Sequence, residues 1–302
     1  MQANFLRVQG VWVRDYEVSF CQSCGGYFLP EVPDSAEMAA YYKSEYYKNV
    51  EGFLVSAVKS LFREFRSESQ SAFVSPLIEG RRGMAILEVG AGDGCLLSRF
   101  SSMANRLLGL EHSPRYFQIA KRKYGVDLMS HDFFDLEEQF DLILMSHVFE
   151  HFPDIERVVG HLRKLLKPKG LVFIEVPHSP RPDECSKEIL QQYVNTTHTY
   201  NFTPQALSPF FERQDFRVLK MGRFFYRIPG NLNWATQHAV GKLFLEGSGG
   251  SFKTVFPAAH YVLKHLFDKK NAFKEVNLEE KFQGFGDNIR IVVAPNVALL
   301  SL

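Results

Sequence analysis

A glycine-rich stretch flanked by acidic residues is the most distinctive chemical feature of the sequence. It reads Glu88-Val-Gly90-Ala91-Gly92-Asp-Gly94 and lies where an apolar run gives way to a helical pattern. Glycines at such a junction let the backbone turn sharply and let a ligand approach the main chain without a Cβ in the way. Glu111 ends the next apolar run, and a carboxylate there can bind a ribose diol. The pattern predicts a nucleoside-binding loop.

The spacing and charge of this loop distinguish between a ligand that carries a pyrophosphate and one that carries a positive charge. A nicotinamide-binding loop has the spacing GxGxxG and leads into a helix N-terminus that receives a pyrophosphate. Here the spacing is GxGxG, and Glu88 precedes the first glycine. A carboxylate beside the loop would repel a pyrophosphate and suits the sulfonium and amino groups of S-adenosylmethionine. We therefore expect S-adenosylmethionine as the cofactor; the alternative is that Glu88 and Glu111 form ordinary salt bridges.

Histidines follow the next two expected strands and the segment after them. His147 and His151 bracket the end of one strand, His178 follows the next, and His198 lies in a polar loop. Methyl transfer to a hydroxyl needs a base, and a neutral imidazole has a suitable pKa. One of the four is the expected catalytic base. In HVFEH the Glu directly precedes the second His, unlike HExxH, so no metal is predicted there.

The elements that must position these residues alternate between strand and helix patterns. Apolar runs at 84–90, 106–111, 126–130, 140–146, 170–177 and 216–222 are separated by amphipathic stretches, and a last run follows at 288–295. This alternation predicts an α/β fold, a doubly wound, Rossmann-like, seven-stranded, mostly parallel sheet with helices on both faces. The expected parts are an N-terminal module (1–50), a lead-in helix (51–82), the core (83–223), an insertion capping the acceptor side (224–285) and the final strand with its tail (286–302).

At these motifs the chain resembles the class I S-adenosylmethionine-dependent methyltransferases, from Met84 to Pro177 and again at the last strand. The resemblance implies that the glycine loop lies along the methionine moiety and that Glu111 binds the ribose. It also implies that Asp132 accepts the adenine amino group beside Phe133, although an Asp in such a turn is often only a cap. Other donor-binding residues expected on this basis are Gly94, His112 and Ser146.

Two further segments resemble methyltransferases of sugar and polysaccharide pathways. One is the run 198–216, in which Thr203-Pro204 has the N-cap and N1 preferences of a helix start. The other is the zinc-knuckle-like CxxCG of Cys21 and Cys24, followed by a tyrosine-rich stretch. The first cysteine pair of such a zinc module is absent, so either the site has decayed or its other ligands come from elsewhere.

These resemblances predict O-methylation of a sugar, nucleotide-sugar or surface glycan, with Phe224, Phe225, Tyr226 and Trp234 near the acceptor or in a core of their own. One alternative is a methyltransferase for a lipid, a quinone or another small molecule. A sugar C-methyltransferase is less expected, because His198-Thr-Tyr-Asn replaces the usual Glu-His. A non-enzymatic alternative is an inactive scaffold of the same fold.

The composition and charge of the chain limit the classes of molecule expected to bind it. The 302 residues carry 35 Lys and Arg against 34 Asp and Glu, a formal charge of +1, which disfavours nucleic acid as a partner. No apolar run is long enough to span a bilayer, and no signal peptide is recognised, so we expect a cytoplasmic protein without stable membrane insertion. The expected partner is a small-molecule or glycan methyl acceptor, and the oligomeric state is not predicted.

Overall fold

The computed structural model describes residues 4–8, 16–29, 53–181, 198–226, 273–278 and 287–296. Contacts divide the chain into one unit of Met1–Val32, Gln70–Phe225 and Glu275–Leu302, and a second of Pro33–Ser69 and Tyr226–Lys274. Trp234 and the tyrosine-rich stretch that follows Cys24 lie outside the described residues.

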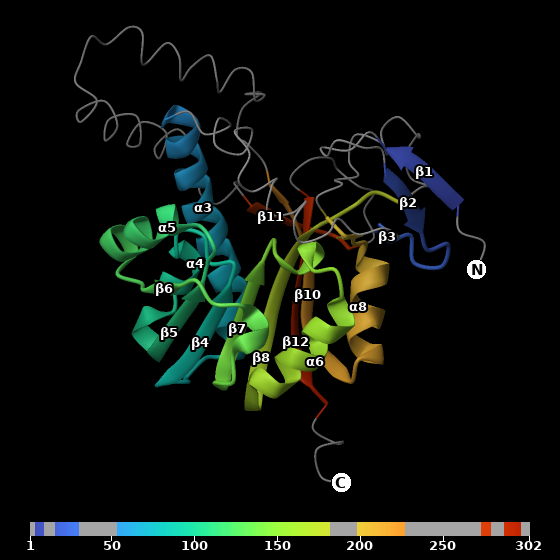
Figure 1. Ribbon diagram of the computed structural model, residues 1–302. Coiled ribbons are helices and arrows are strands. Elements are labelled where there is room, and N and C mark those ends of the chain that lie inside the picture. The colour runs from blue at the N-terminus through green and yellow to red at the C-terminus, as the bar shows by residue number, and fades with distance from the viewer. Residues whose placement is uncertain are drawn as a thin grey trace, which may run out of the picture. The chain divides into compact units, whose positions relative to one another are not determined.

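An eight-stranded sheet forms the centre of the first unit (Figure 1). Its order is β11-β10-β12-β8-β7-β4-β5-β6. Five neighbouring strands are parallel, whereas β12 runs antiparallel to both β8 and β10. The strands are β4 (Met84–Val89), β5 (Ala104–Leu110), β6 (Leu128–Met129), β7 (Phe140–Ser146), β8 (Leu166–Pro177), β10 (Phe216–Tyr226), β11 (Phe273–Val276) and β12 (Asp287–Pro295). The seven expected strands and the doubly wound α/β class are confirmed, and β11 is an additional strand.

Two layers of helices enclose this sheet. One apolar cluster joins α6 (Ile155–Leu165) and α8 (Pro204–Arg213) to one face, and a second joins the end of α3 (Phe53–Val74) and α4 (Cys95–Ser98) to the other. Strand β7 shows how the sequence sets this arrangement, because Ile143 and Met145 face the first cluster while Leu142 and Leu144 face the second. The remaining helical segments are η1 (Ser75–Leu77), η2 (Ser101–Met103), α5 (Pro114–Ile119), η3 (Ala120–Tyr124), η4 (Phe133–Asp135) and η5 (Phe149–His151).

The strand order reverses between β4 and β7. From β4 the chain proceeds outward to β5 and β6, then returns to place β7 on the other side of β4 and continues to β8. In open α/β sheets a ligand binds beyond the carboxyl ends of the strands at such a reversal. The segments that follow β4 and β7 are the glycine loop and the HVFEH stretch, so the fold brings the two predicted halves of the site to one place.

Strand β8 begins earlier than the apolar run expected at 170–177. Helix α6 ends at Leu165 and β8 begins at Leu166, so Lys167-Pro-Lys-Gly170 belongs to the strand. Phe140 pairs with Leu166 and Leu142 with Leu171, so extra residues of β8 lie opposite β7. The segment is therefore an irregularity within the strand, and the chain passes from α6 into β8 without a separate loop.

A small antiparallel sheet holds the CxxCG segment. Its order is β1-β2-β3-β9, with β1 (Asn4–Val8), β2 (Tyr16–Phe20), β3 (Tyr27–Phe28) and β9 (Tyr200–Asn201). The CxxCG residues form the turn between β2 and β3, where Gly25 N–H donates to Cys21 O at 2.7 Å. Cys21 and Cys24 are free thiols, and the pKa of Cys21 falls to about 7 chiefly because the Ser23 hydroxyl hydrogen-bonds it.

The structure describes part of the lead-in helix and the first residues of the expected insertion. The lead-in helix begins at Phe53, and Phe65 is buried, whereas the side chains of Leu54, Val58, Leu61 and Phe62 lie outside the described part. Phe224 is buried in the core, with its ring 5.4 Å from that of Phe73, which fits the alternative that it is a packing residue. Among the described helices, none combines the length and the apolar character needed to cross a bilayer.

Candidate active site

The glycine bend follows β4 directly. Gly90 and Gly92 have φ of +68° and +52°, in the left-handed region that favours glycine. A Cβ on Gly90 would lie 2.3 Å from Val148 Cγ2, so this glycine is required by the packing of the segment after β7. A Cβ on Gly92 would meet nothing within 4 Å, so there is open space beside its backbone. Ala91 donates its N–H to Leu110 O, and Gly94 directly precedes α4.

Glu111 is the acid that lines this bend. Its Oε2 accepts the Gly92 N–H at 2.9 Å and its Oε1 accepts the Ser113 N–H at 2.8 Å. Glu88 is buried and turns the other way, accepting the Leu97 N–H of α4 at 2.9 Å. The predicted contact of Glu88 with the donor therefore remains a prediction, and the structure shows a role for Glu88 in holding α4 against β4.

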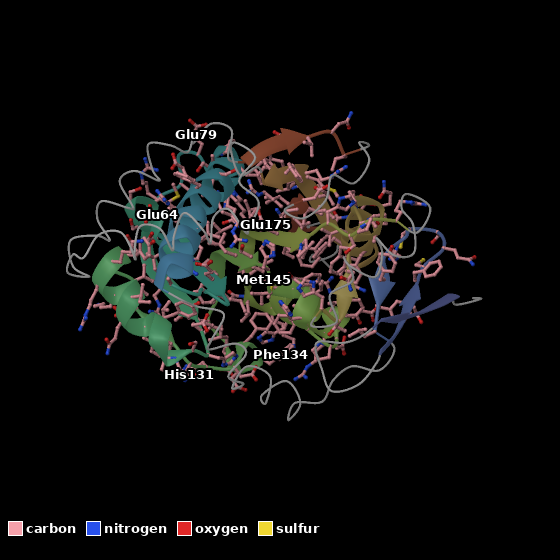
Figure 2. The ribbon with its side chains drawn as sticks, turned by 90° about the horizontal axis from the view of Figure 1, so that it is seen from above. Glu64, Glu79, His131, Phe134, Met145 and Glu175 are labelled. Carbon is pink, nitrogen blue, oxygen red and sulfur yellow. The ribbon has the colours of Figure 1, made fainter. Side chains whose placement is uncertain are left out.

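The residues expected around adenine lie after β6. Asp132 Oδ1 accepts the Phe134 N–H at 2.8 Å and so caps η4, which is the simpler alternative for this residue. Phe133 is buried against the rings of Phe152 and His161. His112 is exposed. Figure 2 shows His131, next to Asp132, at the periphery of the molecule and Met145 and Glu175 in its interior.

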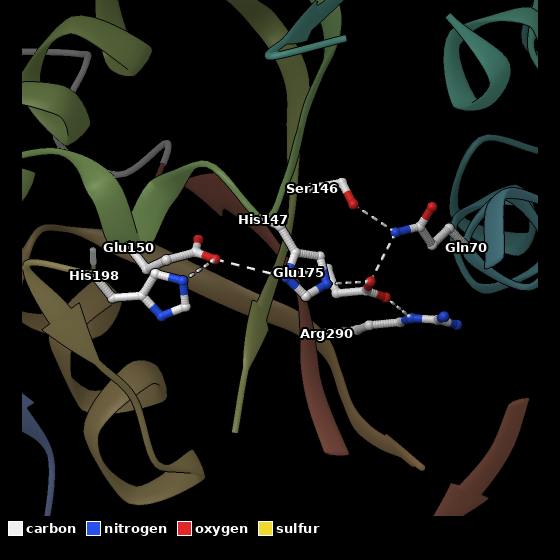
Figure 3. Close-up of polar contacts among 7 residues, drawn as sticks. All are labelled: Gln70, Ser146, His147, Glu150, Glu175, His198 and Arg290. Carbon is white, nitrogen blue, oxygen red and sulfur yellow. Dashed lines mark hydrogen bonds and ion pairs between the residues drawn. The ribbon is translucent and has the colours of Figure 1, made fainter. Parts of the chain in front are cut away.

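A row of polar residues extends from the end of β7 (Figure 3). His147 has φ of +54° and donates its backbone N–H to Glu175 O at 2.8 Å. Its ring Nε2 lies 3.1 Å from Glu175 Oε1, and its Nδ1 lies 3.6 Å from Glu150 Oε1. With 27% of its side chain exposed, His147 is reachable from solvent while both carboxylates are buried.

Glu175 is held by donors on both of its carboxylate oxygens. Gln70 Nε2 donates to its Oε1 at 2.9 Å and also to Ser146 Oγ at 2.8 Å, and the buried Arg290 guanidinium donates to its Oε2. In the tautomer that carries its proton on Nε2, the neutral His147 ring donates to Glu175 and presents its acceptor nitrogen, Nδ1, on the side of Glu150.

His151 and His198 lie at the other end of this row. Their rings make an edge contact at a centroid distance of 4.7 Å, and His198 Nε2 lies 4.0 Å from Glu150 Oε1. Burial, together with the neighbouring His151 and His147, lowers the pKa of His198 to about 2. His198 is therefore a neutral imidazole at physiological pH.

His178 belongs to a different network. Its Nδ1 lies 3.0 Å from Asp287 Oδ2, and Arg223 binds the same carboxylate through Nε at 3.0 Å and Nη2 at 2.6 Å. Only 4% of the His178 side chain is exposed. The structure thus brings three of the four candidate histidines together and places His178 in a buried ion-pair cluster.

Three residues of the His147 network were not predicted from the sequence: Gln70, Glu175 and Arg290. A signal for two of them was present, since Glu175 and Arg290 are single charges inside the apolar runs GLVFIEVP and NIRIVVAP. Charged residues are rarely buried unless paired, and these two are directly opposite in the β8–β12 ladder. No sequence spacing indicates Gln70, which comes from α3.

The bend has the properties that S-adenosylmethionine requires. Gly92 leaves open space next to the main chain, and Glu111 presents a half-buried carboxylate at the same place. A positively charged ligand with a ribose diol fits this donor set better than a diphosphate does. Gly90, Ala91, Gly92 and Glu111 would hold the donor, and Ser146 and His147 would lie toward the acceptor. These features define an adenosyl-binding α/β enzyme.

Comparison with known proteins identifies the family. The family described as a methyltransferase domain matches residues 62–221, more than half of the chain. The chain therefore belongs to the methyltransferase domain family, and its methyl donor is S-adenosylmethionine.

Individual relatives are more distant. A ubiquinone biosynthesis O-methyltransferase of Bartonella bacilliformis is 29% identical over 30% of this chain and 40% of its own length. A demethylmenaquinone methyltransferase of Chlorobaculum parvum is 24% identical over 49% of this chain and 68% of its own length. The chain thus spans about 40% of the former protein and about two thirds of the latter. A magnesium protoporphyrin IX methyltransferase from Synechocystis, solved with bound SAH, is 15% identical with a TM-score of 0.49, covering 63% of this chain and 93% of that chain.

Proposed function

We propose that this protein transfers the methyl group of S-adenosylmethionine to a hydroxyl oxygen of a small quinone-type molecule, with His147 as the general base. The names of the relatives support the small-molecule alternative more than the sugar acceptor expected from the sequence. The observation that carries the proposal is the position of His147, a partly exposed imidazole at the end of β7 whose Nε2 lies 3.1 Å from Glu175 Oε1 and whose Nδ1 lies 3.6 Å from Glu150 Oε1.

The proposed step balances as follows. S-adenosylmethionine supplies a methyl carbon whose bond to the positively charged sulfur breaks as the new carbon–oxygen bond forms. His147 Nδ1 takes the proton of the acceptor hydroxyl, and the charge that develops on the ring is offset by Glu150 at 3.6 Å. Glu175 acts as a positioning residue, because it holds the Nε2–H tautomer and the ring orientation. The strained backbone at His147 keeps the ring at this edge of the sheet.

Turnover of a panel of acceptors tests both parts of the proposal. Hydroxylated quinone precursors and nucleotide-sugars are assayed side by side with labelled S-adenosylmethionine. We expect methylation of the former, and a fall of about 10² or more in kcat for His147→Ala, the range that general-base catalysis contributes. Binding of S-adenosylmethionine by this variant, measured by calorimetry, should match the wild type.

Two results would overturn the proposal. Methylation of nucleotide-sugars alone would return the acceptor to the sugar class. An unchanged kcat for His147→Ala would remove His147 as the base, whichever acceptor is methylated.

A further inference from the structure

The structure places a third histidine beside a Glu-His pair. Glu150 and His151 lie on η5, and each of Glu150, His151 and His198 offers one ligand atom, all within 4.8 Å of one another. The sequence predicts no metal at HVFEH, because its spacing is not that of HExxH. His198 is distant in sequence and enters the cluster only through the fold, so the spacing of the motif could not reveal it.

The surrounding contacts hold this cluster in place. The buried Thr199 donates its hydroxyl to His151 O at 3.4 Å, and Tyr200 donates its hydroxyl to Pro153 O at 3.3 Å. The two residues that follow His198 therefore tie its segment to His151 of η5 and to Pro153 just beyond it. Glu150 is fully buried, and His151 and His198 are partly buried, so the three ligand atoms meet in a protected position.

The donor set indicates the kind of ion. Two imidazoles and one carboxylate suit a divalent transition metal such as Zn²⁺, Fe²⁺ or Co²⁺, whereas Mg²⁺ and Ca²⁺ prefer oxygen ligands. Imidazoles bind a metal through a ring nitrogen, and His151 and His198 each offer one to the cluster. Metal–ligand distances of about 2.0–2.2 Å put ligand atoms roughly 3.4 Å apart in tetrahedral geometry. The ligand atoms here lie within 4.8 Å of one another, so they would move closer together when an ion binds.

We propose that Glu150, His151 and His198 bind a divalent transition-metal ion next to His147. Three protein ligands leave at least one coordination position open, as catalytic metal sites do. An acceptor oxygen in that position would lose its proton more readily, with His147 at hand to receive it. This catalytic role rests on the proposed function, but binding of the ion does not.

Calorimetric titration of chelator-stripped full-length protein with ZnCl₂ tests the site. The thiols of Cys21 and Cys24 also attract zinc, so the titration is made in a Cys21→Ser/Cys24→Ser background. In that background Glu150→Gln and His198→Gln each remove one ligand. His161→Gln is the matched control, because His161 is also partly buried but contacts Phe133 O instead of a carboxylate. Circular dichroism and S-adenosylmethionine binding establish that each variant is folded.

We expect one Zn²⁺ per chain in the background protein and in His161→Gln, and affinity at least about tenfold lower in Glu150→Gln and His198→Gln. Should Glu150→Gln fail to fold, His198→Gln decides alone. Equal affinity in all variants, or no zinc binding in the background protein, would overturn the site. Because the readout is metal binding, failure of the acceptor assay and failure of this titration are distinguishable.

Discussion

At the scale of single residues, two buried arginines organise the polar part of the sheet. Arg290 pairs with Glu175, which orients His147, and Arg223 pairs with Asp287, which binds His178. Both arginines are fully buried. Removing one partner of such a pair lowers the free energy of unfolding by more than the intact pair adds to it, because a buried charge is left uncompensated. Each carboxylate is therefore expected to matter for stability as well as for the histidine that it binds.

The substitution Asp287→Asn tests the contribution of the Arg223–Asp287 pair to stability. Loss of the carboxylate leaves the Arg223 charge unpaired, and we expect the free energy of unfolding at pH 7 to fall by about 3–5 kcal/mol. Urea unfolding measures it. Asp127→Asn is the control, since Asp127 pairs with Lys121 on the exposed surface and should cost less than about 1 kcal/mol.

The same variant has a predicted pH dependence. Burial raises the pKa of Asp287, but hydrogen bonds and charge from His178 and Arg223 outweigh it and hold the pKa below its usual value. A lowered pKa gives stability that is present above the unfolded pKa of about 3.9 and is lost as the pH falls through the folded value. The difference between wild type and Asp287→Asn should therefore shrink below about pH 4. A difference that stays constant or grows with acid would contradict this assignment.

At the scale of elements, local sequence signals predicted those parts whose structure depends on near neighbours. Thr203-Pro204 predicts a helix start, and Thr203 is the N-cap of α8, accepting the Ala206 N–H. The consecutive apolar residues of β7 predict a strand buried on both faces, and its side chains lie alternately in the two apolar clusters. The early start of β8, at Leu166 and not at residue 170, could not be predicted locally, because it depends on pairing with β7.

Thr203→Ala tests the junction between α8 and the CxxCG turn. The Thr203 hydroxyl caps α8 and donates to Cys24 O at 2.6 Å, and the residue is fully buried. We expect a loss of about 1–2 kcal/mol in thermal or urea unfolding. Ser208→Ala, which removes only an exposed hydrogen bond to Glu212 within the same helix, should stay within about 0.5 kcal/mol. Equal effects of the two substitutions would show that the cap contributes nothing.

At the scale of the whole molecule, the sequence locates features built from consecutive segments more readily than features built from distant ones. The glycine bend and Glu111 follow consecutive strands, so a linear motif suffices to find them. The Glu150, His151 and His198 cluster and the Gln70–Glu175–Arg290 contacts join segments that are far apart in the chain. Residue types alone could propose four histidines, but only the fold could separate His178 from the other three.

Binding of S-adenosylmethionine to Gly92→Ala is the most direct test of the central claim, that the open side of the glycine bend holds the donor. Gly125→Ala is its matched control, because both glycines have positive φ and neither added Cβ meets an atom within 4 Å. Both variants should lose about 1–2 kcal/mol of stability through backbone strain. We predict that calorimetry will show wild-type affinity for Gly125→Ala and strongly weakened binding for Gly92→Ala. Equal affinity in the two variants, or no binding by the wild type, would contradict the account.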